Sequence, residues 1–252
     1  MKIISILGCG WLGTALAIHF LSKRFIVRGS TRSNQKLKQL EAIGIESFLI
    51  DIKSPQGSSF FESDYLIIAI TCKDNLAIKQ FSNFLADCNV KKIIFISSTS
   101  VYLAQNKVVT EESPINNNSL TYQFEQSLTK QKSFHTSVLR FGGLFGSERN
   151  PTSFFREDRP LKDPNGRINL IHQQDCIQII EEIIKQEVWG ETFNACADTH
   201  LSKFFFYSRL YQKEGKTLYI IDQEEISSYK IISSQKLIDQ LNYRFVYNEL
   251  ME

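Results

Sequence analysis

Short apolar runs alternate with amphipathic stretches along the first 145 residues of the chain. The apolar runs are brief, continuous and rich in β-branched residues, which is the pattern of strands buried on both faces; they cover 2–7, 25–27, 45–50, 65–70, 92–96 and 136–141. Between them, apolar residues recur at helical spacing over 11–23, 35–43, 75–88 and 119–131. Strands that alternate with helices predict an α/β fold with a doubly wound parallel sheet, the Rossmann arrangement.

The texture of the sequence changes after Gly142 and Gly143. A proline-containing loop is predicted over 147–169, followed by helices at 175–186, 201–212 and 234–241 and by strands at 192–196 and 218–221. We therefore predict a nucleotide-binding domain over 1–146 and a small C-terminal α/β substrate-binding region over 147–252, packed on it.

Composition narrows the functional classes. The 252 residues include 29 Lys and Arg against 27 Asp and Glu, a net charge of +2, so a nucleic-acid partner is not expected. The five cysteines show no C-x-x-C spacing, which predicts reduced thiols in a cytoplasmic protein. No stretch approaches the length of a membrane-spanning helix, so no membrane partner is expected, and we predict a monomer or a homodimer.

A glycine-rich segment joins the first predicted strand to the first predicted helix. Gly8-Cys9-Gly10-Trp11-Leu12-Gly13 matches G-x-G-x-x-G in the strand–turn–helix context that gives this motif its meaning. Gly8 allows the tight turn, Gly10 lets the backbone approach a pyrophosphate, and Gly13 lets helix and sheet pack closely. The anion would sit at the positive end of the helix, so we predict that Gly8, Gly10, Trp11, Leu12 and Gly13 form a dinucleotide site.

The end of the second predicted strand bears on the choice of cofactor. NAD sites usually place an acid here for the ribose 2′-hydroxyl, but the residues from Arg28 to Arg32 include no acid. An Arg pairs with a 2′-phosphate through charge-assisted hydrogen bonds, and hydroxyl groups assist. We predict NADP, with NAD as the alternative, bound by Arg32 with help from Ser30 and Thr31.

Several segments together resemble the extended and atypical short-chain dehydrogenase/reductases, the NAD-dependent epimerase/dehydratase group, and above all a bacterial subgroup of atypical members. The similar segments, beyond the glycine loop, are Ile96-Ser97-Ser98-Thr99-Ser100-Val101-Tyr102, Arg140-Phe141-Gly142-Gly143-Leu144-Phe145-Gly146, Ile171-His172-Gln173-Gln174-Asp175 and Thr192-Phe193-Asn194. The resemblance implies an acid near the adenine at Asp51, and it leads us to add Thr71, after the fourth predicted strand, to the cofactor site.

The resemblance also implies a mechanism. In the family, the Tyr of a Y-x-x-x-K dyad acts as acid and base while nicotinamide exchanges a hydride, and a Ser or Thr holds the substrate oxygen. Ser98 matches the last position. When Glu125 is aligned with the glutamate that commonly follows the Lys, the dyad positions hold Asn117 and Thr121, which cannot do this chemistry.

Two nearby phenols remain as candidate acids, Tyr122 and Tyr102. We predict an epimerase/dehydratase-like oxidoreductase for a small carbonyl, sugar or nucleotide-sugar substrate, with non-standard acid/base residues. The missing dyad favours an alternative, a non-catalytic NADP(H)-binding sensor or scaffold of the same fold. No metal is expected, because Asp175 is predicted to cap a helix and His172 to lie in the segment before it.

Overall fold

The computed structural model describes residues 1–103, 106–154, 161–216, 218 and 229–250. The chain divides into two compact units that interleave along the sequence. Unit 1 comprises Met1–Val101, Asn116–Arg140 and Ile180–Thr192, and unit 2 comprises Tyr102–Ile115, Phe141–Ile179 and Phe193–Glu252. The prediction placed a single boundary after residue 146, whereas the structure shows several crossings between the units.

Parallel strands of unit 1 form the greater part of the central sheet. Its elements, in chain order, are β1 (Ile3–Leu7), α1 (Trp11–Ser22), β2 (Ile26–Thr31), α2 (Asn34–Ala42), β3 (Glu46–Leu49), β4 (Tyr65–Ile68), α3 (Asn75–Ala86), β5 (Lys92–Ser98), α4 (Leu120–Thr129) and β7 (His135–Phe141). The seven-stranded sheet has the order β10-β7-β5-β4-β1-β2-β3, with β10 at Thr192–Ala195. The chain winds outward from β1 in both directions, which confirms the doubly wound α/β prediction.

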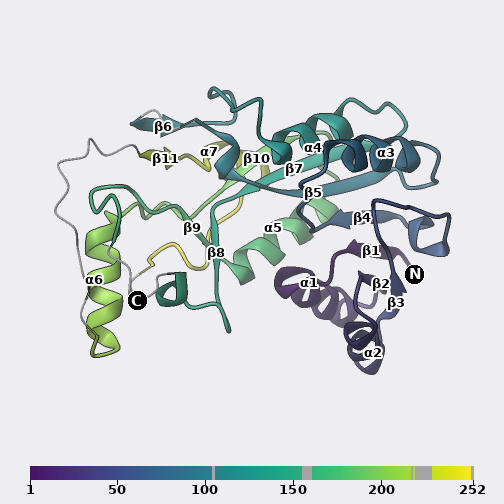
Figure 1. Cartoon of the computed structure of the whole chain (residues 1–252), viewed down its shortest axis with the longest axis horizontal. Coiled ribbons are helices and arrows are strands. Elements are labelled where there is room, and N and C mark those ends of the chain that lie inside the picture. The colour runs from purple at the N-terminus through teal and green to yellow at the C-terminus, as the bar shows by residue number, and fades with distance from the viewer. Residues whose placement is uncertain (104–105, 155–160, 217, 219–228, 251–252) are drawn as a thin grey trace. The chain divides into compact units, whose positions relative to one another are not determined.

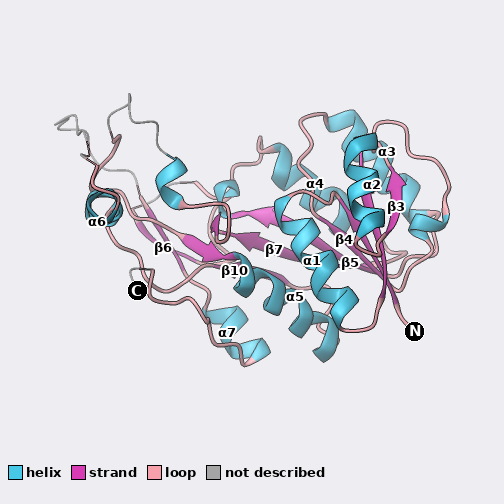
Figure 2. Cartoon of the chain, turned by 90° about the horizontal axis from the view of Figure 1, so that it is seen from below, coloured by secondary structure: helices cyan, strands magenta, loops and turns pink. Residues whose placement is uncertain are grey.

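Helices cover both faces of this sheet, as Figures 1 and 2 show. Helices α1 and α2 lie on one face, and α3 and α4 lie side by side on the other. The space between the sheet and α3 and α4 is filled by a phenylalanine-rich core that includes Phe60, Phe61, Phe81, Phe95 and Phe124, each at most 2% exposed. This packing fixes the carboxyl ends of the strands, where ligands bind in such sheets.

Unit 2 contains shorter elements. They are β6 (Lys107–Val109), β8 (Gly143–Phe145), β9 (Leu170–His172), α6 (Lys203–Lys213), β11 (Lys230–Ile232) and α7 (Gln235–Leu241), while α5 (Gln173–Gln186) runs from unit 2 into unit 1. Strand β6 pairs with β11, and β8 pairs with β9, each in parallel. These three-residue strands escaped prediction because they are too short to show a period. The strand predicted at 218–221 lies outside the described residues, except for Leu218.

Within the described part of the chain, every helix is too short or too polar to cross a bilayer.

Candidate nucleotide site

A cavity of about 1030 Å³ opens at the carboxyl ends of β1, β2, β3 and β4. It lies in unit 1, next to the position where the winding of the sheet reverses between β1 and β4. This is the crevice in which open α/β sheets bind their ligands. Its walls are formed by Leu7–Gly10, Ser30–Arg32, Ile50–Lys53 and Ala69–Leu76.

The glycine loop forms one wall of the cavity, and at Gly8 and Gly13 a side chain would clash with the protein itself. Gly8 has a φ of +96°, and a Cβ there would lie 2.3 Å from Ile70. A Cβ on Gly13 would lie 2.2 Å from the carbonyl oxygen of Gly8, so only glycine lets α1 start this close to the strand. A Cβ on Gly10 would meet no described atom within 4 Å, and α1 has no side-chain cap at this position. The positive end of α1 is therefore open for an anion.

Ser30 holds the glycine loop against β2. Its hydroxyl accepts a hydrogen bond from the Gly8 amide at 3.0 Å, and its carbonyl accepts one from the Cys9 amide at 2.8 Å. Ser30 is only 1% exposed, so these bonds are shielded from water. The neighbouring Cys9 is buried in the core, and this burial raises the pKa of its thiol to about 12. The structure thus gives Ser30 a scaffolding role beside the predicted contact with the cofactor.

Arg32 is the cation that the end of β2 presents to the cavity. Its side chain is exposed and forms no ion pair with any residue that the structure describes. Arg28, the other arginine of this segment, bonds to Glu46 at 2.9 Å and to the carbonyl of Glu62 at 2.8 Å, so it is a structural residue. Thr31 also lines the cavity, and its hydroxyl accepts a hydrogen bond from the Ser33 amide at 3.1 Å. Of the two arginines, Arg32 is the one whose charge is available to a ligand.

The other predicted cofactor residues fall into two groups. Asp51 and Thr71 line the cavity, as do Gly8 and Gly10. Trp11, Leu12 and Gly13 do not line it; Leu12 is 6% exposed and belongs to the core. The structure therefore supports only a backbone role for these three residues, in which they form the start of α1 next to the cavity.

The loop between β4 and α3 adds residues that the sequence reasoning missed. Asp74 caps α3 by accepting hydrogen bonds from the amides of Leu76 and Ala77 at 3.1 and 3.2 Å. The Ala77 bond is the main reason that the pKa of Asp74 is lowered, and Lys53, 3.6 Å away, adds to it. Lys73 also lines the cavity and forms no ion pair with a described residue. Asp74 could have been recognised as a helix cap, because an Asp directly before a helical period is a typical N-cap. Nothing in the sequence indicated that Lys73 would line the cavity.

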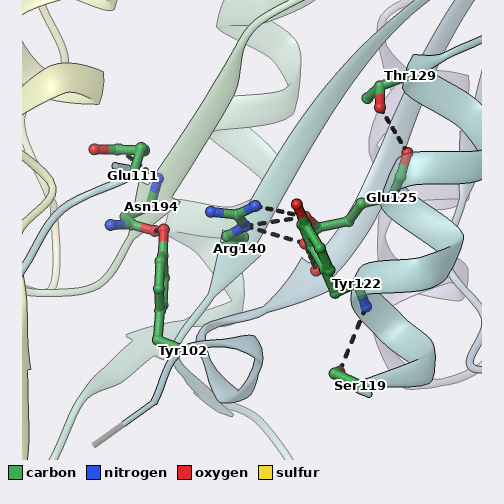
Figure 3. A network of polar contacts seen from close by, with 9 residues as sticks. Tyr102, Glu111, Ser119, Tyr122, Glu125, Thr129, Arg140 and Asn194 are labelled. Carbon is green, nitrogen blue, oxygen red and sulfur yellow. Dashed lines mark hydrogen bonds and ion pairs between the residues drawn. The ribbon is translucent and has the colours of Figure 1, made fainter. Parts of the chain in front are cut away.

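Two of the predicted catalytic residues belong to unit 1, and they lie in different surroundings. Ser98 ends β5, is half-buried, and accepts a hydrogen bond from the Ser100 amide at 3.1 Å. Tyr122 lies in the first turn of α4, and its backbone amide donates a hydrogen bond to the hydroxyl of the cap residue Ser119 at 3.4 Å (Figure 3). It is one of the residues that line a groove between α3 and α4. Tyr122 does not line the nucleotide cavity.

A buried ion pair lies close to the end of β5. Arg140 of β7 donates to both carboxylate oxygens of Glu125 in α4, with Nη2 2.6 Å from Oε2 and Nε 3.1 Å from Oε1 (Figure 3). The Ser97 hydroxyl donates to the same carboxylate. Arg140 is 4% exposed and Glu125 is 2% exposed. The three side chains therefore tie α4 to the ends of β5 and β7, next to Ser98 in the sequence.

Tyr102, the third catalytic candidate, lies in unit 2 and is 3% exposed. Its phenol donates a hydrogen bond to Oδ1 of Asn194 at 2.7 Å, and the backbone N–H of Asn194 donates to the Glu111 carboxylate at 2.7 Å (Figure 3). The proton that an acid would deliver is therefore engaged in a structural hydrogen bond.

The structure corrects the role predicted for Asp175. Helix α5 begins at Gln173, so Asp175 lies inside its first turn rather than at the cap. Its buried carboxylate accepts hydrogen bonds from the Tyr243 hydroxyl at 2.7 Å and from the amides of Val246 and Tyr247 at 2.8 and 3.1 Å. His172 stacks on Tyr247 at 3.6 Å, and burial lowers its pKa. Among the described residues, no group of three His, Cys, Asp or Glu could hold a metal ion.

No protein-family model matches the sequence. The chain is 25% identical over 266 residues to Protein YeeZ of Escherichia coli K12, covering 98% of this chain and 97% of that protein. A conserved protein of unknown function from Silicibacter pomeroyi has a TM-score of 0.84 at 18% identity, covering 99% of this chain and 95% of that one. A mutant of UDP-glucuronic acid 4-epimerase from Bacillus cereus, in complex with a fluorinated UDP-sugar and NAD, has a TM-score of 0.80 at 18% identity, covering 98% and 94%.

These similarities concern the fold. The chain has the fold of NAD-dependent epimerase/dehydratases and of short-chain dehydrogenase/reductase superfamily proteins, which confirms the predicted resemblance at that level.

Proposed function

We propose that this protein binds a nicotinamide dinucleotide in the cavity, NADP in preference to NAD, and acts as an epimerase/dehydratase-like oxidoreductase on a small carbonyl, sugar or nucleotide-sugar substrate. The observation that carries the proposal is the open end of α1 at Gly10, with the unpaired cation of Arg32 on the neighbouring strand of the described structure. The B. cereus epimerase, which binds NAD and a UDP-sugar, has the same fold and supports this class of reaction.

The residues of the cavity fit the parts of such a cofactor. The start of α1 would hold the pyrophosphate, and Arg32 and Thr31 a 2′-phosphate. Asp51 would lie at the adenine end, and Lys73 would add a second cation for the phosphates. When bound, the nicotinamide would supply hydride transfer to or from a carbon that bears oxygen.

The acid/base step is the unusual part of the proposal. Neither Asn117 nor Thr121 can replace the Tyr and Lys that related enzymes use, and no tyrosine is found among the described residues that line the cavity. Ser98 would hold the substrate oxygen through its hydroxyl. Of the two candidate phenols, Tyr122 would be the proton donor, because the phenol of Tyr102 is held by Asn194.

The missing dyad favours a second function, a sensor or scaffold that binds NADP(H) without turnover. Whether any substrate causes oxidation of NADPH distinguishes the two functions. Substrate-dependent oxidation of NADPH, followed by its absorbance over a panel of carbonyl compounds and nucleotide sugars, supports the enzyme, provided that Ser98→Ala abolishes it. A partner protein whose affinity changes between NADP and NADPH, with no oxidation of any substrate, supports the sensor.

Protection of Cys72 from alkylation tests whether the cavity binds the cofactor. This thiol is half-buried in the cavity wall, whereas Cys9, Cys176 and Cys196 are buried. We expect NADPH at about ten times its dissociation constant to slow iodoacetamide labelling of Cys72 about tenfold, because only the free protein reacts. Cys88 is also half-buried but lies outside the cavity, so its rate serves as the internal control. Equal labelling of Cys72 with and without NADPH contradicts the proposal.

The choice between NADP and NAD is tested by Arg32→Ala. Loss of a charge-assisted contact with the 2′-phosphate is expected to weaken NADPH binding by about 10- to 100-fold. NADH lacks that phosphate, so its affinity should change little. Lys38→Ala removes the same charge from an exposed position on α2 outside the cavity, and it should leave both affinities unchanged. An equal loss for NADH and NADPH in isothermal titration would show that Arg32 does not read the 2′-phosphate.

A further inference from the structure

A smaller cavity, of about 410 Å³, lies beside the nucleotide cavity in unit 1. Arg32, Ile50 and Asp51 line both cavities, so the two meet just past the ends of β2 and β3. The rest of this outer pocket is formed by Leu49 and by the chain that follows β3, which contributes Ser54, Gln56, Gly57 and Ser58. The cation proposed above for the 2′-phosphate therefore stands at the border of a second space.

The chain that forms the outer pocket is fixed at both ends. At its start, the Asp51 carboxylate accepts a hydrogen bond from the Lys53 amide at 3.0 Å, and the Asp51 carbonyl accepts one from the Ser54 amide at 3.2 Å. At its end, the Ser58 hydroxyl accepts a hydrogen bond from the amide of Phe60, whose ring is buried in the core. The pocket therefore has its shape before a ligand arrives, which lowers the entropic cost of binding.

Three polar side chains of the outer pocket are available to a ligand. Arg32, Ser54 and Gln56 are exposed, and none of their side chains forms a hydrogen bond or ion pair with a residue that the structure describes. A guanidinium, a hydroxyl and a primary amide all offer donors that suit phosphate oxygens. Thr31, the hydroxyl proposed above to assist Arg32, does not line this pocket, and its oxygen accepts a hydrogen bond from the Ser33 amide.

Asp51 is the one acidic residue among the described residues that line the outer pocket. It lines the same pocket as Arg32, so its negative charge offsets part of the attraction that Arg32 exerts on an anion. A phosphate bound here therefore needs donors in addition to the single cation. Ser54 and Gln56 supply such donors without adding a charge of their own.

We propose that the outer pocket receives the 2′-phosphate of NADP, and that Ser54 and Gln56 act with Arg32 as specificity-determining residues for the cofactor. The inference rests on the proposed function, because the rest of the cofactor must lie in the nucleotide cavity. The Ser54 hydroxyl and the Gln56 amide donate hydrogen bonds to the phosphate oxygens, and Arg32 supplies the charge. NADH has no phosphate to place in the pocket, so these two residues distinguish the two cofactors.

The test compares adenosine 2′,5′-bisphosphate with AMP by calorimetry on the full-length protein, because these probes differ only by the 2′-phosphate. The bisphosphate should bind at least about tenfold more tightly than AMP. Ser54→Ala and Gln56→Ala should each weaken the bisphosphate about three- to tenfold and leave AMP unchanged, since each removes one hydrogen bond to a charged group. Asp51→Asn should widen the difference between the probes, because it removes the opposing charge.

Ser59→Ala and Gln35→Ala are the matched controls for the two substitutions to alanine. Both side chains are exposed, and neither residue lines the nucleotide cavity or the outer pocket. Both variants should bind the bisphosphate and AMP as the unchanged protein does.

Three outcomes overturn the inference while nucleotide binding by the first cavity stands. The bisphosphate binds no more tightly than AMP, or Asp51→Asn leaves the difference between the probes unchanged. Alternatively, Arg32→Ala weakens the bisphosphate whereas Ser54→Ala and Gln56→Ala do not, so the phosphate is bound from the nucleotide cavity alone. If AMP, the bisphosphate and NADPH all fail to bind, the nucleotide-cavity proposal itself is wrong and the inference falls with it; the loss of AMP binding identifies this case.

Discussion

Gly13→Ala is expected to lower the free energy of unfolding by about 3 kcal/mol or more, because a methyl group 2.2 Å from the Gly8 carbonyl forces α1 away from β1. The obstacle is backbone rather than a flexible side chain, so repacking cannot relieve it cheaply. The midpoint of urea unfolding, followed by circular dichroism, measures the loss.

Gly10→Ala is the matched variant, because its Cβ meets no described protein atom. We expect a loss of stability of about 1 kcal/mol at most, because Gly10 is the N-cap of α1, where alanine is less favourable than glycine. NADPH binding should nevertheless fall at least about tenfold, because the methyl group occupies the place where the backbone must approach the pyrophosphate. A Gly10→Ala protein that binds NADPH normally would show that the loop is only a tight turn.

Arg140→Met is the second substitution with a large expected effect. It leaves the Glu125 carboxylate buried without its cation, and we expect a loss of about 3–5 kcal/mol in the free energy of unfolding. The Ser97 hydroxyl alone cannot compensate for the charge. The double variant Glu125→Leu with Arg140→Met removes both charges and should recover most of the loss.

Urea unfolding of the two proteins measures this difference. A double variant no more stable than the single one would mean that the pair itself, rather than the avoidance of an unpaired charge, stabilises the fold.

The part of the site closest to the sequence signal was the most predictable. The glycine loop followed an apolar run and preceded a helical period, and strand β1, loop and α1 all formed as expected. Strand β2 was predicted over 25–27 but extends to Thr31, because Arg28, Gly29 and Ser30 are held by partners distant in sequence. Arg28 bonds to Glu46, and a Cβ on Gly29 would lie 2.8 Å from Cys9 and Ile45. A local pattern cannot contain such contacts.

The chemistry was harder to predict than the framework. Tyr122 was predicted to lie near the active site because it follows the missing dyad, but it does not line the nucleotide cavity and is one of the residues that line the groove between α3 and α4. A helix rotates its side chains by about 100° per residue, so a shift of one position from a catalytic residue changes the face entirely. Tyr102 and Asp175 were recognised as important positions, yet their hydrogen-bond partners, Asn194 and Tyr243, lie 92 and 68 residues away.

The anchoring of the glycine loop by Ser30 limits how cofactor preference can be re-engineered. The usual change toward NAD places an acid at the end of the second strand. At Ser30, an aspartate would bury a charge, and its longer side chain would displace the acceptor that fixes the Gly8 amide, so the loop would be damaged together with the preference. Arg32 is exposed and does not hold the glycine loop, so substitutions there can change the preference between NADP and NAD while the loop keeps its shape. A change of cofactor preference in this protein is therefore expected to occur at Arg32 rather than at Ser30.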